Sequence, residues 1–118
     1  MESLQVVPRL SPGVCPVTDM FAFIGSKWTP LVVVQLYLGT RRFGELQRSL
    51  PGISPKTLAE RLHALEEQGL ATRTVHPDKP PRVEYALSRR GRELGELLAG
   101  IADWARARPI AGLPTASG

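Results

Sequence analysis

The 118-residue sequence has few residues that could cross-link it or bind a metal. It contains one cysteine, Cys15, and two histidines. A single cysteine excludes an internal disulfide framework and is typical of a protein in the reducing cytoplasm, where we expect this one. Two histidines and one cysteine are too few for an ordinary closed zinc site. We therefore expect neither a metal nor another cofactor.

Long hydrophobic runs are also missing. The strongest apolar run, Leu31 to Val34, is far shorter than the ~20 residues of a membrane span. The N-terminus lacks the basic and apolar regions of a secretory signal, so we expect no membrane association. The sequence contains no P-loop and no GxGxxG motif, and nothing in the spacing pairs Cys15 with His63 or His76 as nucleophile and base. An enzyme is therefore not expected.

Positive charge is concentrated in the middle of the chain. The net charge is +4, and residues 41–92 hold 11 basic and 6 acidic residues, against 4 basic and 5 acidic residues in the rest. Clustered positive charge indicates a polyanionic partner such as nucleic acid. An arginine-rich but merely solvated surface is the alternative.

The pattern of turn residues and apolar periodicity predicts one domain, residues 15–107, between an irregular arm (1–14) and a flexible tail (108–118). Thr29 and Pro30 are expected to cap and begin a helix that runs to about Leu38, although its LVVV run also fits a strand. Ser54 and Pro55 should begin another helix, which Gly69 ends. The other expected elements are helices at 18–24 and 44–50, a short extended piece at 41–43, strands at 70–75 and 82–87 around a loop at 76–81, and a last helix capped by Ser88.

This order of elements indicates the fold. A short helix, a four-residue turn and a second helix make a helix-turn-helix, and two antiparallel strands directly after it make a wing. The predicted fold class is therefore mainly α with a small β-hairpin wing, a winged helix-turn-helix.

The helix after Ser54 has two different faces. Leu58, Leu62 and Leu65 form a narrow apolar stripe. The rest of the helix presents polar side chains that can contact base edges in the major groove of DNA. The alternative is an ordinary solvated face. Phosphate contacts are expected from the wing and from the first helix of the motif. The candidate DNA-binding residues are Ser54, Lys56, Thr57, Glu60 and Arg61 on the helix, Lys79 and Arg82 on the wing, and Arg41, Arg42 and Arg48 in or before the first helix.

The last helix carries more apolar surface than one small domain obviously covers. Its apolar residues recur every three or four positions: Leu94, Leu97, Leu98, Ile101 and Trp104. This stripe favours a homodimer interface, and an intrachain core is the alternative.

Six segments resemble the HxlR-type winged helix-turn-helix transcriptional regulators of bacteria and archaea. They are CP (15–16), IGSKW (24–28), RRFGEL (41–46), PGISPKTLAERLHALEEQGL (51–70), PPRVEYALSRRG (80–91) and the late Trp104. The resemblance covers about residues 15–106 in unbroken order. Ser26 stands where the family often has glycine, which affects only a turn.

The resemblance implies a homodimeric regulator of double-stranded promoter DNA. Its dimer is implied to form through the N-terminal helix region, with Phe21, and the last helix. A two-fold dimer predicts an inverted-repeat operator, and we expect a repressor. Some family members respond to oxidants or electrophiles through a cysteine that matches Cys15. Two alternatives stay open: a winged helix used only for protein contacts, and a MarR-like or ArsR-like regulator that responds to a small ligand.

Overall fold

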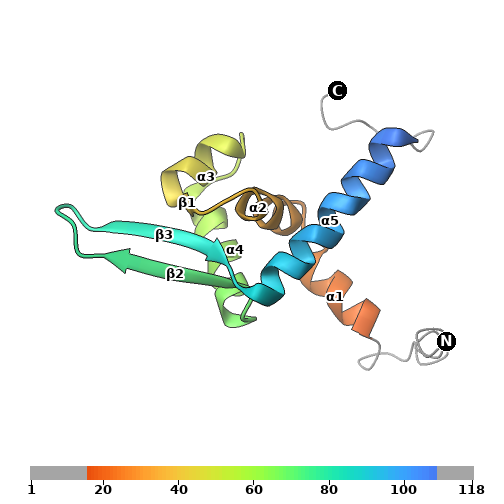
Figure 1. The fold of residues 1–118 in the computed structure, drawn as a ribbon, viewed down its shortest axis with the longest axis horizontal. Helices are drawn as coiled ribbons and strands as arrows, with labels where there is room; N and C mark the ends of the chain where they lie inside the picture. Colours follow the sequence, from red (N-terminus) through yellow and green to blue (C-terminus); the bar gives the residue numbers. More distant parts are fainter. Residues whose placement is uncertain (1–15, 109–118) are drawn as a thin grey trace.

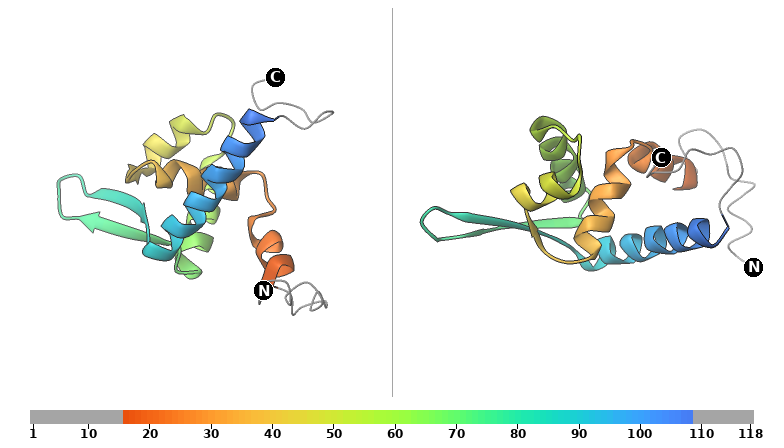
Figure 2. Two further views of the ribbon diagram at one scale, coloured as in Figure 1. Left: turned by 45° about the vertical axis from the view of Figure 1, so that its right-hand side comes forward. Right: turned by 90° about the horizontal axis from the view of Figure 1, so that it is seen from above.

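The computed structural model describes residues 16–108, so the predicted arm at 1–14 and all but Arg108 of the predicted tail lie outside the described residues. Helices dominate this part of the chain, and the hairpin projects from one side of the helical body (Figures 1 and 2). The elements are α1 (Pro16–Ile24), α2 (Trp28–Tyr37), β1 (Arg41–Arg42), α3 (Phe43–Ser49), α4 (Pro55–Glu67), β2 (Ala71–His76), β3 (Arg82–Leu87) and α5 (Arg89–Ala107).

The predicted helix-turn-helix is formed by α3 and α4. The chain turns at Gly52, whose φ of 94° is a conformation that side chains with a Cβ rarely adopt. The Ile53 N–H donates to the Leu50 carbonyl across the turn at 3.1 Å. Ser54 then caps α4, with Pro55 at its first turn, and Gly69 follows its end with a φ of 72°. Both ends of α4 therefore lie where the sequence predicted them.

The wing is larger than the predicted hairpin. β2 and β3 pair as expected, but the two residues of β1 add a third antiparallel strand, in the order β1-β3-β2. Arg41 lies opposite Tyr85, and Arg42 lies opposite Glu84. His76, expected in the loop, is the last residue of β2 and pairs with Arg82. The β1–β3 pairing connects the middle of β3 to β1, which directly precedes the first residue of α3.

The start of α2 also differs from the prediction. Thr29 does not cap this helix, which begins at Trp28. Thr29 is buried in the first turn, and its N–H donates to the Ser26 hydroxyl at 3.2 Å. Ser26 therefore satisfies the backbone donor that an N-cap side chain would take. The β-branched run after it is helical, and Val32 and Val33 are fully buried.

The core lies between α2, the helix-turn-helix and the inner face of the sheet. α4 contributes the predicted stripe, because Leu58, Leu62 and Leu65 are at most 1% exposed. The other buried apolar residues are Val32, Val33, Leu36, Leu46, Leu50, Ile53, Leu70, Ala71, Tyr85 and Leu87. Burial of the stripe fixes the orientation of α4 and leaves its polar face outward.

α5 packs closely on the body only in its first half. A Cβ at Gly91 would lie 1.9 Å from the Leu70 carbonyl oxygen, and one at Gly95 would lie 2.8 Å from the Tyr37 ring. Gly91 lets α5 approach the backbone at Leu70, directly before β2, and Gly95 lets α5 cross α2 at Tyr37. The second half of α5 extends away from the body (Figure 1). Within residues 16–108, no single helix has both the length and the apolarity to cross a membrane. Only α1 and α2 taken together pass by length and composition, and they bend by 88° at their junction.

Candidate nucleic-acid interface

The polar face of α4 presents the side chains that the sequence predicted. Lys56 and Glu60 are exposed, and Thr57 and Arg61 are partly buried. The positions of these residues follow from the burial of the leucine stripe on the other side of the helix. α4 therefore offers the Lys56 ammonium and the Glu60 carboxylate on its outward face, and the partly buried Arg61 lies beside the leucine stripe.

The first turn of α4 is held by two hydroxyl groups. Ser54 Oγ accepts a hydrogen bond from the Thr57 N–H at 3.0 Å and donates to Thr57 Oγ1 at 3.0 Å. Both contacts belong to the helix cap, so Ser54 already has a structural task. The Thr57 hydroxyl accepts from Ser54, which leaves its own proton for another acceptor.

Two arginines of the predicted surface have a buried nitrogen that makes no hydrogen bond. Among the described residues, the buried side-chain nitrogen or oxygen atoms without a hydrogen bond are Arg61 Nε and Arg82 Nε. A buried donor without a hydrogen bond is unfavourable and is unusual in a folded protein, although Arg82 Nε lies within ion-pair distance of two carboxylates. Both such atoms belong to side chains that the sequence assigned to DNA binding, one on α4 and one on the wing.

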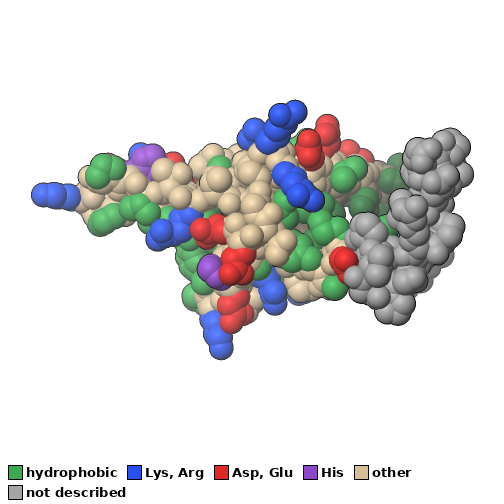
Figure 3. Space-filling model, turned by 90° about the horizontal axis from the view of Figure 1, so that it is seen from below, with side chains coloured by type: hydrophobic (Ala, Val, Ile, Leu, Met, Phe, Trp, Pro, Cys, Tyr) green, Lys and Arg blue, Asp and Glu red, His purple; other side chains and the backbone are tan. Residues whose placement is uncertain are grey.

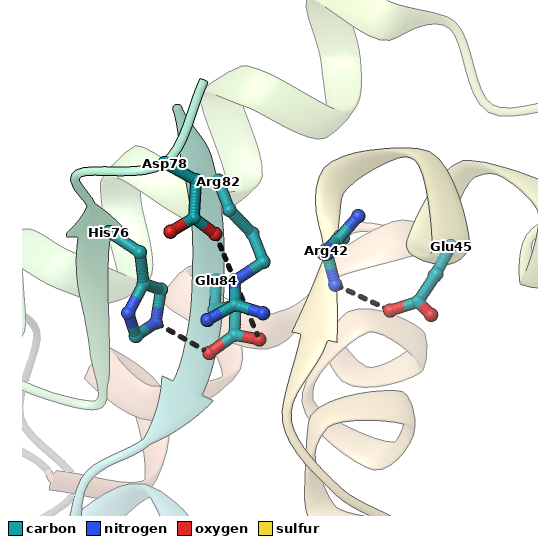
Figure 4. A network of polar contacts seen from close by, with 6 residues as sticks. All are labelled: Arg42, Glu45, His76, Asp78, Arg82 and Glu84. Carbon is teal, nitrogen blue, oxygen red and sulfur yellow. Dashed lines mark hydrogen bonds and ion pairs between the residues drawn. The ribbon is translucent and has the colours of Figure 1, made fainter. Parts of the chain in front are cut away.

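A groove of about 470 Å³ separates the wing from the start of α3. It brings together three of the predicted basic residues, Arg42, Lys79 and Arg82, with Asp78 as an acidic neighbour. The Arg42 N–H donates to Glu45 Oε1 at 2.8 Å, which fixes the backbone where β1 becomes α3 (Figure 4). Positive charge from two segments far apart in sequence therefore lines one groove.

Glu84 connects the residues beside this groove. His76 Nε2 lies 2.8 Å from Glu84 Oε1, and Arg82 Nε lies 3.8 Å from Glu84 Oε2 (Figure 4). Arg82 Nε also lies 3.5 Å from Asp78 Oδ2. The hydrogen bond from His76 is the main cause that lowers the pKa of Glu84 below its usual value, and the charges of Arg82, His76 and Arg42 add to it. Glu84 is therefore a carboxylate at neutral pH.

The remaining predicted basic residues gather elsewhere. Arg41 and Arg48 line a second hollow of about 310 Å³ with Glu45 and Ser49. Arg48 is exposed on α3, and Arg41 is partly buried on β1. Basic side chains also lie at the tip of the wing, and on the face shown in Figure 3 they alternate with acidic ones. The ten candidate residues thus form three groups rather than one patch: the face of α4, the groove beside the wing and the Arg41–Arg48 hollow.

The residues predicted for a dimer interface divide into two kinds. Leu94 and Leu98 are partly buried and pack against the core of their own chain. Phe21 on α1 and Leu97, Ile101 and Trp104 on α5 are 61–68% exposed. Within residues 16–108, nothing covers the outer apolar face of α5. Cys15 lies outside the described residues.

The wing network was not predicted from the sequence. His76 was expected in the loop at 76–81, and none of His76, Asp78 and Glu84 was among the candidate DNA-binding residues. The alternation of side chains along a strand could have indicated this network, because Arg82, Glu84 and His76, the partner of Arg82, project to one face of the sheet. This inference requires the register of β2 on β3, which the sequence does not give. The pairing of Arg42 with Glu84 could not be predicted from the sequence either.

Comparisons with known proteins agree with this geometry. Residues 23–109 match the family described as HxlR-like helix-turn-helix. The chain is 43% identical over 95 residues to the HTH-type transcriptional regulator sll1512 of Synechocystis sp., which covers 77% of this chain and 70% of that one.

Solved structures of regulators share the fold. A transcriptional regulator from Porphyromonas gingivalis, described as of the MarR family, superimposes with a TM-score of 0.78 at 35% identity and covers 86% of this chain and 98% of its own. The oxidized form of the redox regulator HypR superimposes with a TM-score of 0.74 at 32% identity. This match covers 82% of this chain and 100% of the HypR chain. The reduced form of the transcriptional regulator YodB from B. subtilis superimposes with a TM-score of 0.72 at 34% identity. This match covers 85% of this chain and 99% of the YodB chain.

The family match covers most of the described chain, and the winged helix-turn-helix and the relatives point the same way. The prediction of a transcriptional regulator rather than an enzyme is confirmed. The chain belongs to the HxlR-like helix-turn-helix family of transcriptional regulators.

Proposed function

We propose that this regulator recognises a specific DNA sequence as a homodimer and represses transcription by occluding a promoter. The observation that carries the proposal is the outward face of α4. Its opposite side is fixed in the core by Leu58, Leu62 and Leu65, so Lys56 and Glu60 point away from the body, and the partly buried Arg61 lies beside the leucine stripe. Side chains of these types can distinguish base pairs in the major groove.

The wing and α3 supply the proposed backbone contacts. Lys79 lies on the wing loop, and Arg42 and Arg82 line the groove between the wing and α3. Contacts of basic side chains with phosphate position a protein on the duplex without reading its sequence. Arg41 and Arg48 would extend these contacts along α3. In this arrangement α4 carries the specificity, and the basic residues around it carry most of the salt-dependent affinity.

The proposed dimer joins two copies through α5 and α1. Leu97, Ile101 and Trp104 form an apolar face on α5, and Phe21 adds an exposed ring on α1. Leaving large apolar side chains in water is unfavourable, and a second copy would bury them. A two-fold dimer presents two α4 helices to an inverted repeat with half-sites about one helical turn apart, or a small multiple of it. Ile101→Glu should leave a folded monomer, which sedimentation would detect.

We also propose that Cys15 senses an oxidant or electrophile. HypR is described as a redox regulator, and its fold and 32% identity make it a relevant relative. Cys15 precedes the first residue of α1, where a helix start can stabilise a thiolate. Cys15→Ser should keep DNA binding but lose release by a quinone or diamide. Release of the variant at the same dose as the wild type would exclude this role.

The proposed function is tested by titrating the protein onto DNA from upstream of its own gene and onto random DNA, at several salt concentrations. A clear preference for the upstream DNA with a steep salt dependence supports a sequence-specific regulator. Equal and salt-sensitive binding would indicate a DNA binder whose operator lies elsewhere. Absence of binding at low salt would favour the protein-contact alternative, or a MarR-like regulator that needs a ligand.

A further inference from the structure

Glu84 occupies the centre of the polar face of the sheet. Across the strand pairs it lies opposite Arg42 of β1 and Thr74 of β2. Directly paired residues and residues two apart along a strand project to the same face, so Arg82 and its partner His76 share this face. Figure 4 shows the Glu84 carboxylate between the side chains of His76 and Arg82. One carboxylate therefore stands among two arginines and a histidine that come from three strands.

Each oxygen of Glu84 has a different partner. Oε1 lies 2.8 Å from His76 Nε2, and Oε2 lies 3.8 Å from Arg82 Nε. The His76 contact comes from the neighbouring strand and fixes the carboxylate against rotation. Because the pKa of Glu84 is lowered, chiefly by this hydrogen bond, the group remains charged at neutral pH. Glu84 is thus a fixed negative charge and not a mobile surface carboxylate.

The contacts of Arg82 place its guanidinium at the edge of the groove. Its two ion pairs, with Asp78 and Glu84, both run through Nε, and Nε is buried. A guanidinium has five N–H donors, four of them on the two terminal nitrogens. Neither contact is a hydrogen bond, and Asp78 is the nearer carboxylate, but both contacts lie at Nε and leave the terminal nitrogens for a phosphate, which arginine binds with two parallel hydrogen bonds. Arg82 also lines the groove of about 470 Å³ with Arg42 and Lys79.

We propose that Glu84 is a positioning residue for DNA binding, which holds Arg82 at the groove between the wing and α3 so that Arg82 binds a backbone phosphate. The inference rests on the proposed function and adds to it the group that orients the wing contact. Glu84 itself does not touch DNA. It acts through Arg82, and His76 acts through Glu84.

Electrostatic repulsion alone would have the opposite effect on binding. A carboxylate near a phosphate repels it, so removing the charge of Glu84 should strengthen binding to all DNA. If Glu84 positions Arg82, removing its charge should weaken binding, because one organised phosphate contact is lost. The two explanations therefore differ in the sign of one measurable change.

The test compares Glu84→Gln with the wild type in DNA titrations at several salt concentrations. Loss of one phosphate contact should weaken binding several-fold on specific and random DNA alike and flatten the slope of log K against log salt by about 0.9. Glu67→Gln is the matched control: Glu67 also faces a histidine, His63, at 3.3 Å, but it lies on the last turn of α4 and is well exposed. The control has the same change in net charge and should keep the wild-type slope.

Two further variants test the route through Arg82. Arg82→Ala should flatten the slope by the same amount, and Glu84→Gln should add nothing in the Arg82→Ala background. His76→Ala keeps the carboxylate but removes the partner of Oε1, and its slope should fall between those of the wild type and Glu84→Gln. Thermal unfolding of each variant checks the fold, and His76→Ala provides the slope comparison if Glu84→Gln does not fold.

Equal or tighter binding by Glu84→Gln with an unchanged slope would overturn the inference, as would additive effects of Glu84→Gln and Arg82→Ala. Either result would leave the proposed function intact, because the wild type would still bind DNA. A wild type without salt-dependent binding would overturn both the proposed function and this inference, so the two failures are distinguishable.

Discussion

Arg61 is the residue of α4 whose replacement tests base recognition most sharply. Its side chain is partly buried, and its Nε makes no hydrogen bond in the protein alone. Arg61→Ala removes this unpaired donor together with the apolar stem of the side chain. The two effects on stability oppose each other, since lost packing destabilises the fold and removal of an unsatisfied donor stabilises it. The free energy of unfolding should therefore change by less than about 1 kcal/mol.

The effect on DNA binding should be much larger. A guanidinium that pairs with guanine O6 and N7 contributes about 1–3 kcal/mol of discrimination. This corresponds to a loss of roughly 5- to 150-fold in affinity for the specific site. Binding to random DNA should weaken far less, because it depends on phosphate contacts and not on base edges. The ratio of specific to random affinity should therefore fall.

The assay is a pair of titrations, on operator and on random DNA, at one fixed salt concentration. Arg61→Lys is the matched control, because it keeps the charge but lacks the planar fork that binds two acceptors. The lysine variant should bind random DNA like the wild type and still lose preference for the operator. Equal losses on both DNAs in Arg61→Ala would refute base recognition and leave Arg61 a phosphate contact. A large drop in unfolding temperature would instead indicate a structural role.

Three further predictions concern the wing, the core and pH. Lys79→Ala should weaken binding to all DNA alike and flatten the salt slope by about 0.9, and a sequence-selective loss in titrations would contradict this. Leu62→Ala should lower the free energy of unfolding in urea by about 2–5 kcal/mol, because Leu62 is 1% exposed, whereas exposed Lys56→Ala should change it by less than about 0.5 kcal/mol. The pKa of Glu84 is lowered from 4.5, so its stabilising contribution is present above that pH and lost as the pH falls through the folded-state pKa. In thermal unfolding, Glu84→Gln should accordingly be less stable than the wild type at about pH 7, with no difference once the carboxyl is protonated.

Local signals predicted α4 well. Ser54, Pro55 and Gly69 define the ends of α4, and the three leucines between them define its buried face. Each of these signals acts over a few residues, so no tertiary information was needed. The strand pair and the Ser88 cap of α5 followed from the same kind of pattern.

The differences arose where distant segments decide the local structure. β1 is only two residues long, and it is a strand because Arg41 and Arg42 pair with β3 some forty positions later. The His76–Glu84–Arg82 network depends on that pairing and on the register of the hairpin. Thr29 looked like a helix cap, but burial of its side chain in the core and a hydrogen bond from its N–H to Ser26 place it inside the first turn. The division of α5 into a packed half and an exposed half depends on the close contacts of Gly91 with Leu70 and of Gly95 with Tyr37.

Under the proposed function, the α4 helix of each copy in the dimer reads one half of a specific DNA sequence. Selection of bound sequences from a random DNA pool, with wild-type protein and with Arg61→Ala in parallel, tests it most directly, because the operator need not be identified first. The wild type should enrich an inverted repeat, and Arg61→Ala should lose preference at one symmetric pair of positions. Recovery of no common sequence by the wild type, or of the same sequence with equal preference by the variant, would contradict it.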